Sequence, residues 1–349
     1  MANLIISPIL EYAIKNNASD IHITEGEALG FRINGNLGKL PRAGIIDKQK
    51  INQILLELLK DDKAVVKSFL DGKDFDFAYI YTDGTPFRVN AFFKLGRIAF
   101  VMRRIASKPK TIEELGLPAG VEKFTKAKQG LILVTGPTGS GKSTSMVSIL
   151  DAINKSRREH IITIEDPVEF IFKDENCIFS QREIGKDTHG FDSALRAAMR
   201  EDPDIVMVGE MRDRETVEAA MELAETGHLV ISTLHTSGSV QTITRIVNFF
   251  HPELQHSVRY KLADTLFGVL SQRLIPTPNK DGRQGIFELM FMTSGIKNLI
   301  RQGDFAQIPN SIEMGSQEGM VSMKTYADRL KDKGIINEED YINYFADEM

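Results

Sequence analysis

The chain has 349 residues, of which 42% are hydrophobic and 26% charged, and this length and composition favour two globular domains. Its formal net charge of −5 argues against a strongly basic face for nucleic-acid phosphates, so we expect no direct nucleic-acid partner. A single cysteine, Cys177, excludes an internal disulfide and a cysteine-based metal cluster. No apolar run approaches the roughly 18 residues of a transmembrane segment, so a membrane role would need a partner.

Residues 1–106 are predicted to form a small domain that mixes helices and strands. Apolar residues at helical spacing predict one helix near Ile5–Ile14 and another over Ile51–Leu59. The sequence TDGTP between two alternating runs predicts a β-hairpin, and Asn34-Gly35-Asn36 predicts a turn. The expected strands of this domain are 20–24, 30–33, 75–81, 87–93 and 98–102.

Residues 107–118 contain two prolines and several charges, a pattern that predicts a linker. From 119 to 349 short apolar runs alternate with polar loops and helical stretches, and the chain is helical after about residue 295. This alternation is typical of a mostly parallel sheet covered by helices, so the fold class is α/β. The runs expected to form strands are 129–135, 161–164, 204–208 and 229–233.

A phosphate-binding loop is the clearest motif, because residues 136–144 (GPTGSGKST) match G-x-x-x-x-G-K-[ST] between an apolar strand and an amphipathic helix. Such glycines let backbone N–H groups close around phosphate oxygens at a helix N-terminus, which favours anions. Lys142 is expected to reach the β- and γ-phosphates, and the Ser143 hydroxyl to ligate Mg²⁺. We therefore expect ATP and Mg²⁺, with the nucleotide held by Gly136, Pro137, Thr138, Gly139, Ser140, Gly141, Lys142, Ser143 and Thr144.

Hydrolysis also needs carboxylates, and each of two predicted strands is followed by a glutamate. Glu165 follows strand 161–164 and is the candidate general base that polarises the attacking water, although in isolation the segment would be interpreted as a solvated acidic loop. Glu210 follows strand 204–208 in a Walker B arrangement and is expected to orient Mg²⁺, directly or through water. Asp204 begins that strand and is expected to cap or pack instead.

Two histidines, His228 and His235, bracket the predicted strand 229–233. A lone histidine is usually structural, whereas a pair around one strand beside a phosphate loop is a candidate for sensing the γ-phosphate. The spacing alone does not decide between these interpretations.

Four blocks in this order resemble the type II and type IV secretion ATPases and, within them, the type IV pilus retraction ATPases of the PilT type. The blocks are the Walker A sequence at 136–144, an aspartate box ITIEDPVEF at 162–170, a Walker B sequence REDPDIVMVGEMRD at 200–213 and a histidine box AETGHLVISTLHT at 224–236. The resemblance covers nearly the whole chain. It implies a RecA-like P-loop domain preceded by a PAS-like α+β domain, with Glu165 as general base, Glu210 as the Walker B glutamate, and His228 and His235 as histidine-box residues.

The first domain resembles the family through SDIHI (19–23), FRVNAF (87–92) and MRRI (102–105). In the family, arginines of this domain reach the nucleotide, and the matching positions here are Arg88 and Arg103. Without the resemblance, both would be interpreted as arginines on a solvated strand face.

The resemblance further implies a cytoplasmic homo-hexamer docked at the inner-membrane face of the pilus machine. Its expected partners are an inner-membrane platform protein and a paralogous retraction ATPase. The chain lacks the four-cysteine metal module that is usual in the pilus assembly and type II secretion ATPases, and this favours the retraction branch.

Two departures from the retraction pattern keep alternatives open. The motif that resembles AIRNLIRE reads GIKNLIRQ at 295–302 and ends in Gln302, and the loop at 25–30 lacks a proline pair. The alternatives are an accessory retraction paralogue, a traffic ATPase of a type II or type IV secretion system, and a nucleotide-binding regulatory subunit that hydrolyses little.

Overall fold

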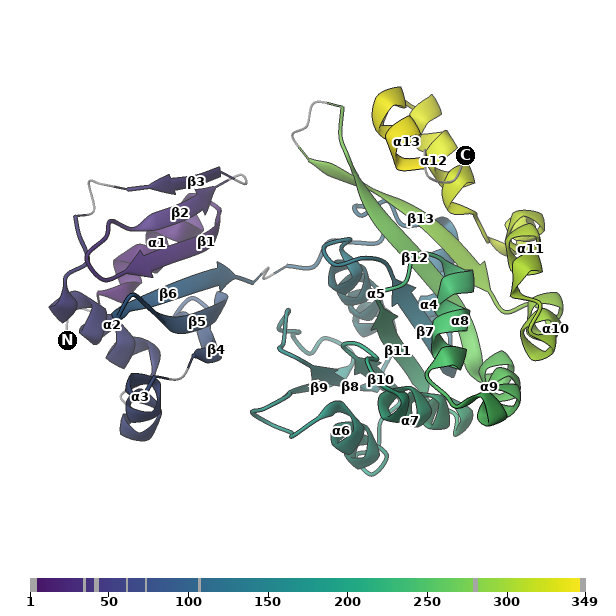
Figure 1. Ribbon diagram of the computed structural model, residues 1–349, viewed down its shortest axis with the longest axis horizontal. Helices are drawn as coiled ribbons and strands as arrows, with labels where there is room; N and C mark the ends of the chain where they lie inside the picture. The colour runs from purple at the N-terminus through teal and green to yellow at the C-terminus, as the bar shows by residue number, and fades with distance from the viewer. Residues whose placement is uncertain are drawn as a thin grey trace. The chain divides into compact units, whose positions relative to one another are not determined.

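The computed structural model describes residues 5–33, 36–40, 44–60, 62–72, 74–105, 108–278 and 282–345 (Figure 1). The chain divides into two compact units, Met1–Lys108 and Pro109–Met349. The turn predicted at 34–36 lies partly outside the described residues. Among the helices described, none combines the length and the apolar character that crossing a bilayer requires.

The first unit is built on a six-stranded antiparallel sheet in the order β3-β2-β1-β6-β5-β4. Asp47 begins the helix over Lys48–Leu58 by accepting a hydrogen bond from the Lys50 N–H, and that helix buries its apolar stripe in the core of the unit. The elements are α1 (Ile6–Lys15), β1 (Ala18–Thr24), β2 (Gly30–Ile33), β3 (Asn36–Lys39), α2 (Lys48–Leu58), α3 (Lys63–Leu70), β4 (Phe75–Ile80), β5 (Pro86–Lys94) and β6 (Arg97–Arg104).

The second unit is an α/β fold around a seven-stranded sheet in the order β13-β12-β7-β11-β10-β8-β9. Six neighbouring strands run parallel and β13 pairs antiparallel with β12. The strands are β7 (Gly130–Thr135), β8 (His160–Glu165), β9 (Ile178–Glu183), β10 (Ile205–Val208), β11 (Leu229–Leu234), β12 (Leu266–Pro276) and β13 (Arg283–Phe291). Every residue of β7, β10 and β11 is buried, as expected of parallel strands covered on both faces.

Helices follow β7, β9, β10 and β11, as the alternation predicted for most of the sheet, and more helices follow β13. Within the described range 108–278, the expected helix after the strand at 161–164 is not found, because β8 is followed by β9. Figure 1 shows the β12–β13 hairpin extending past its neighbouring strands, with α12 and α13 beside the extension. The helices are α4 (Glu122–Lys126), α5 (Lys142–Ser156), α6 (Phe191–Ala198), α7 (Arg214–Glu225), α8 (Ser239–Asn248), α9 (Pro252–Thr265), α10 (Ser294–Gln302), α11 (Ile308–Met314), α12 (Met323–Asp332) and α13 (Glu338–Phe345), with 3-10 turns at Ala119–Val121, Phe305–Gln307 and Gly315–Glu318.

The segment that we expected to be a linker differs from that expectation, because most of it packs onto the second unit. Leu117 belongs to the apolar core of this unit, and Ile112 and Leu115 pack against that core. The segment is also ordered locally, since the Thr111 N–H donates to Glu114 Oε2 at 2.8 Å and the Glu114 N–H donates to Thr111 Oγ1 at 3.2 Å. The prolines interrupted the periodic pattern in the sequence without preventing this packing.

The GIKNLIRQ segment forms α10, and its apolar stripe faces the core. Ile296 and Ile300 are fully buried in the core of the second unit, and Leu299 packs against it. Gln302, the position of the departure from the retraction motif, is exposed at the end of the helix. The departure therefore changes a surface charge and leaves the packing of α10 intact.

We expect Ile300→Ala to lower the free energy of unfolding by about 2–5 kcal/mol, because it leaves a cavity in a closed core. Asn298→Ala, at an exposed position of the same helix, should stay within about 0.5 kcal/mol of the wild type. Urea titration of both variants measures the difference. Equal stability of the two variants would show that the stripe of α10 is not a core element.

Candidate functional site

The phosphate loop joins β7 to α5 and depends on glycines at three positions. Gly136, Gly139 and Gly141 have φ values of 147°, 79° and 88°, in the region that favours glycine. A Cβ added at Gly136 would lie 2.2 Å from the carbonyl oxygen of Gln272 in β12. The loop therefore takes its shape both from its own backbone and from the strand behind it.

Lys142, the first residue of α5, turns back into the loop. Its Nζ donates to the carbonyl oxygens of Gly136 at 2.8 Å and Pro137 at 3.1 Å. Burial lowers the pKa of Lys142, and the charges of Glu210 and Glu169 oppose this shift. A cation is thus held inside the loop, where a phosphate would complete its hydrogen bonding.

Glu165 ends β8 and is 6% exposed. Thr163 Oγ1 donates to its Oε1 at 2.8 Å, Gln181 Nε2 lies 3.3 Å from the same oxygen, and the Glu169 N–H donates to Oε2 at 3.2 Å. Burial raises the pKa of Glu165 to about 7, against the lowering effect of these hydrogen bonds. A carboxylate with this pKa can take up and release a proton near neutral pH.

Glu210 follows β10 and accepts hydrogen bonds from two cationic or ionisable groups. Arg212 forms a close ion pair with Glu210 Oε1, and His235 Nε2 lies 3.3 Å from Glu210 Oε2. Burial would raise the pKa of Glu210, but the hydrogen bonds and charges of Arg212 and His235 hold it below its ordinary value. Glu210 is therefore a carboxylate at neutral pH, and its pKa shift is opposite in direction to that of Glu165.

His235 connects the separate parts of this cluster. Its Nδ1 lies 3.5 Å from Lys142 Nζ and 3.4 Å from Thr138 Oγ1, while Nε2 approaches Glu210. The structure thus brings the predicted residues Lys142, Glu210 and His235 together. Asp204 lies at the other end of β10, where it accepts a hydrogen bond from the His160 N–H at 2.8 Å, the capping role expected of it.

We expected His228 and His235 to lie together beside the phosphate loop. The structure differs from this expectation, because His228 is not part of the cluster. It lies at the start of β11, and His235 lies just past the end of that strand. Six residues of strand lie between them, so the two backbone positions are about 23 Å apart. His228 Nδ1 lies 3.1 Å from both the Leu223 carbonyl oxygen and Thr226 Oγ1, contacts that close the turn after α7.

In the first unit, Arg88 and Arg103 are cross-strand partners on β5 and β6. Asp20 on β1 pairs in register with both Arg103 and Arg32, so these four residues form one row across four strands. Arg103 Nε donates to Asp20 Oδ1 at 2.8 Å. Burial would raise the pKa of Asp20, but Arg103, Ser19 and Arg32 hold it below its ordinary value. The charged Asp20 therefore holds Arg103 on the same face as Arg88.

The donors that we predicted for Mg²⁺ have the chemistry this ion prefers. Ser143 offers a hydroxyl in the first turn of α5, and Glu210 offers an ionised carboxylate beside Lys142. Mg²⁺ selects such oxygen ligands and keeps several waters. No group of three or more His, Cys, Asp or Glu side chains within the described ranges is arranged as a metal site of its own.

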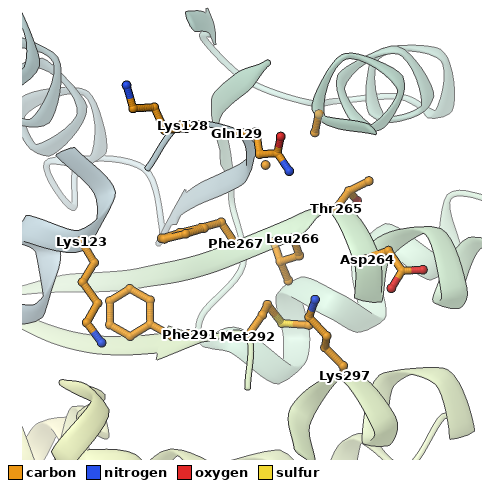
Figure 2. Close-up of a pocket in the computed structure, with 12 residues that line it drawn as sticks. Lys123, Lys128, Gln129, Asp264, Thr265, Leu266, Phe267, Phe291, Met292 and Lys297 are labelled. Atoms are coloured by element: carbon orange, nitrogen blue, oxygen red, sulfur yellow. The ribbon is translucent and has the colours of Figure 1, made fainter. Parts of the chain in front are cut away.

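A pocket of about 500 Å³ lies at the other edge of the sheet, where β7 and β12 begin (Figure 2). Phe267 and Phe291 line it, with Lys123 Nζ 4.8 Å from the centre of the Phe291 ring. Because the length of β7 separates this pocket from the phosphate loop, it is not part of the nucleotide cluster.

Gln181 and Gln272 contact the site, although no local motif indicates them. Gln181 lies sixteen residues after Glu165 and reaches it because β9 pairs in register with β8. Gln272 lies on β12 and donates through Nε2 to the Ser140 carbonyl oxygen at 2.6 Å. Only knowledge of the strand order could have identified either residue from the sequence.

The raised pKa of Glu165 predicts a pH-dependent stability. Between the ordinary value of 4.5 and about 7 the folded protein holds a proton that the unfolded chain has lost. The stabilisation is complete below 4.5 and is lost as pH rises toward 7, by at most about 1.4 kcal/mol per pH unit. Urea titrations at several pH values should show this slope in the wild type and a shallower one in Glu165→Gln. Identical slopes would contradict the pKa shift.

Comparisons with known proteins show the family to which the chain belongs. The family described as Type II/IV secretion system protein matches residues 1–327. The type IV pilus retraction ATPase PilT of Pseudomonas aeruginosa is 40% identical over 96% of each chain, and the type IV pilus ATPase PilU of that organism is 33% identical over 95% of this chain and 86% of its own. A crystal structure of the pilus retraction motor PilT with bound ADP superposes with a TM-score of 0.90, at 40% identity over 97% of this chain and 96% of the other. The chain therefore belongs to the Type II/IV secretion system protein family and is an ATPase.

Proposed function

We propose that this protein hydrolyses ATP to ADP and phosphate in order to drive retraction of a type IV pilus. The observation that carries the proposal is its likeness, over nearly the whole chain and fold, to a pilus retraction motor that was crystallised with ADP. The cluster of Lys142, Glu210 and His235, together with Glu165 at the end of β8, offers the chemistry that such an activity needs.

The nucleotide phosphates would lie in the loop 136–144, against backbone N–H groups and the N-terminus of α5. Lys142 would exchange its bonds to loop carbonyls for phosphate oxygens. Glu165 would accept a proton from water as the water oxygen attacks the γ-phosphorus. The bond between the γ-phosphorus and the bridging oxygen then breaks, and ADP and phosphate leave. The pKa of about 7 suits a base that must be regenerated at neutral pH.

Ser143 and Glu210 would hold Mg²⁺, which when bound neutralises charge on the phosphate oxygens. Arg212 and His235 would keep Glu210 ionised and oriented for this purpose. His235 also lies beside Lys142 and Thr138, so it would respond to a γ-phosphate in the loop.

Arg88 and Arg103 would complete the site from a first unit that we expect to be PAS-like. A planar guanidinium can bind two phosphate oxygens at once and stabilise charge that develops during transfer. We propose that six copies form a ring in the cytoplasm, docked at the inner membrane, and that turnover moves an inner-membrane platform protein. A paralogous retraction ATPase is a further candidate partner.

An accessory retraction role is the second candidate, motivated by the exposed Gln302 in place of the glutamate of the retraction motif. The higher identity to PilT than to PilU supports a primary motor. The carboxylates at Glu165 and Glu210 argue against a regulatory subunit that hydrolyses little. The missing four-cysteine module argues against a traffic ATPase.

Two substitutions separate nucleotide binding from hydrolysis. Lys142→Ala should lose ATP affinity and turnover together, because it removes the cation inside the loop. Glu165→Gln keeps the side-chain shape and removes the base, so it should bind ATP while turnover falls about 10²–10⁴-fold. Calorimetry and phosphate release measure the two quantities, with the exposed Glu175→Gln as control. Near-normal turnover of Glu165→Gln would make the base assignment wrong.

The direction of work is tested in cells that lack the gene. We expect pili to remain on the surface, in normal or increased number, while surface motility by retraction fails. Cells without pili would assign the protein to assembly instead. Piliated cells that retract normally would assign it an accessory role.

A further inference from the structure

Gln272 supports the phosphate loop from behind. It is 2% exposed, and its Nε2 donates to the Ser140 carbonyl oxygen at 2.6 Å. Its Oε1 is buried with no hydrogen-bond partner among the described residues. A buried amide with an unpaired oxygen costs stability that an apolar residue of the same size would not. This cost suggests that Gln272 has a role in shaping the loop.

The glycines of the loop fit around Gln272. A Cβ added at Gly136 would collide with its carbonyl oxygen at 2.2 Å, and one added at Gly141 would lie 3.2 Å from its Nε2. At Gly139 the same test meets no described heavy atom within 4 Å. The loop is thus packed on Gln272 along one side and open along the other.

Glu288 performs a similar task on β13, the next strand of the hairpin. Its Oε1 accepts hydrogen bonds from the Ser239 N–H and the Ser239 hydroxyl, both at 2.7 Å. Ser239 begins α8, four residues after His235, and is 1% exposed. Glu288 therefore anchors the short segment that carries His235.

Gln272 and Glu288 belong to one hairpin, formed by β12 and β13. Glu288 lies directly opposite Ser271, the neighbour of Gln272, in the antiparallel pairing of β12 with β13. Ser271 also shares a buried hydrogen bond of 2.8 Å with Thr135, the last residue of β7. A shift of the hairpin would displace the phosphate loop and the His235 segment together.

We propose that the β12–β13 hairpin positions both sides of the nucleotide site, with Gln272 holding the phosphate loop and Glu288 holding the His235 segment. Both are positioning residues, because they act through groups that would meet the nucleotide. This inference rests on the proposed binding of the nucleotide at the loop. Substitutions of the two residues should affect different kinetic constants. The loop that Gln272 holds binds ground and transition states alike, so its loss should raise KM. The segment that Glu288 holds carries His235, which contacts Lys142 and Glu210, so its loss should lower kcat.

Gln272→Met keeps the length of the side chain and removes the donor to Ser140. We expect the KM for ATP and the Kd for ADP to rise about three- to tenfold, with kcat within about twofold of the wild type. Gln255→Met is the matched control, because Gln255 Nε2 also donates to a backbone carbonyl, that of Phe250 at 3.2 Å, and it should change neither constant. Gln272→Asn, one methylene shorter, replaces the Met variant if that fails to fold.

An unchanged KM and Kd in the folded Gln272 variant would overturn its half of the proposal, as would a loss of kcat at constant KM. If Lys142→Ala still binds ATP normally, the proposed nucleotide site is wrong. If Gln272→Met has normal kinetics while Lys142→Ala cannot bind ATP, only the positioning role of Gln272 is refuted.

Glu288→Ala should lower kcat about three- to tenfold and change KM less, because the His235 segment loses two hydrogen bonds. Glu288→Gln keeps an oxygen acceptor in the same place and should restore most of kcat. Wild-type kcat in the Ala variant would overturn the role of Glu288. Equal losses in both variants would show that its charge, not its acceptor, matters, and would also overturn the proposal.

Discussion

The parallel pairing of the central strands is the constraint on which the site depends. Thr135 at the end of β7 lies in register with Leu234 of β11 and with Ser271 of β12, and Val208 of β10 lies in register with Ile164 of β8. The residues that follow these positions must therefore emerge at one edge of the sheet. They include Gly136, His235, Gln272, Glu165 and Glu210, which no helix or loop could gather without this register.

Short sequence patterns predicted those parts of the candidate site that come from one continuous segment of the chain. The loop 136–144 follows from its own glycines and lysine, and Glu165 and Glu210 follow from the rule that ligands lie at strand ends. Gln181 and Gln272 could not be predicted, because strand order decides which residues reach the site. His228 was placed wrongly for a related reason: two residues bracketing one strand lie at opposite edges of the sheet.

In the antiparallel sheet of the first unit, too, the strand order decides which residues lie together, and the sequence pattern does not show it. The sequence pattern predicted the strands of this unit except β3, but the row of Arg32, Asp20, Arg103 and Arg88 depends on four strands being neighbours in one register. Arg103 and Arg88 are like charges on adjacent strands and repel each other, and the ionised Asp20 beside Arg103 offsets part of that repulsion. An arginine side chain that would otherwise be mobile on a solvated face is thereby held in one direction.

Burial raises the pKa of both carboxylates of the site, but their net pKa shifts have opposite directions, and this difference supports the roles proposed for them. Among the described residues, the hydrogen-bond donors to Glu165 are all neutral, so desolvation dominates and its proton is retained up to a pH of about 7. Glu210 has Arg212 and His235 beside it, so its charge persists despite burial. A carboxyl group that can exchange a proton near neutral pH and a carboxylate that stays charged therefore lie at the ends of neighbouring strands of one sheet. A fully solvated glutamate would be too weak a base near neutral pH, so the burial of Glu165 supports the proposal that it is the general base.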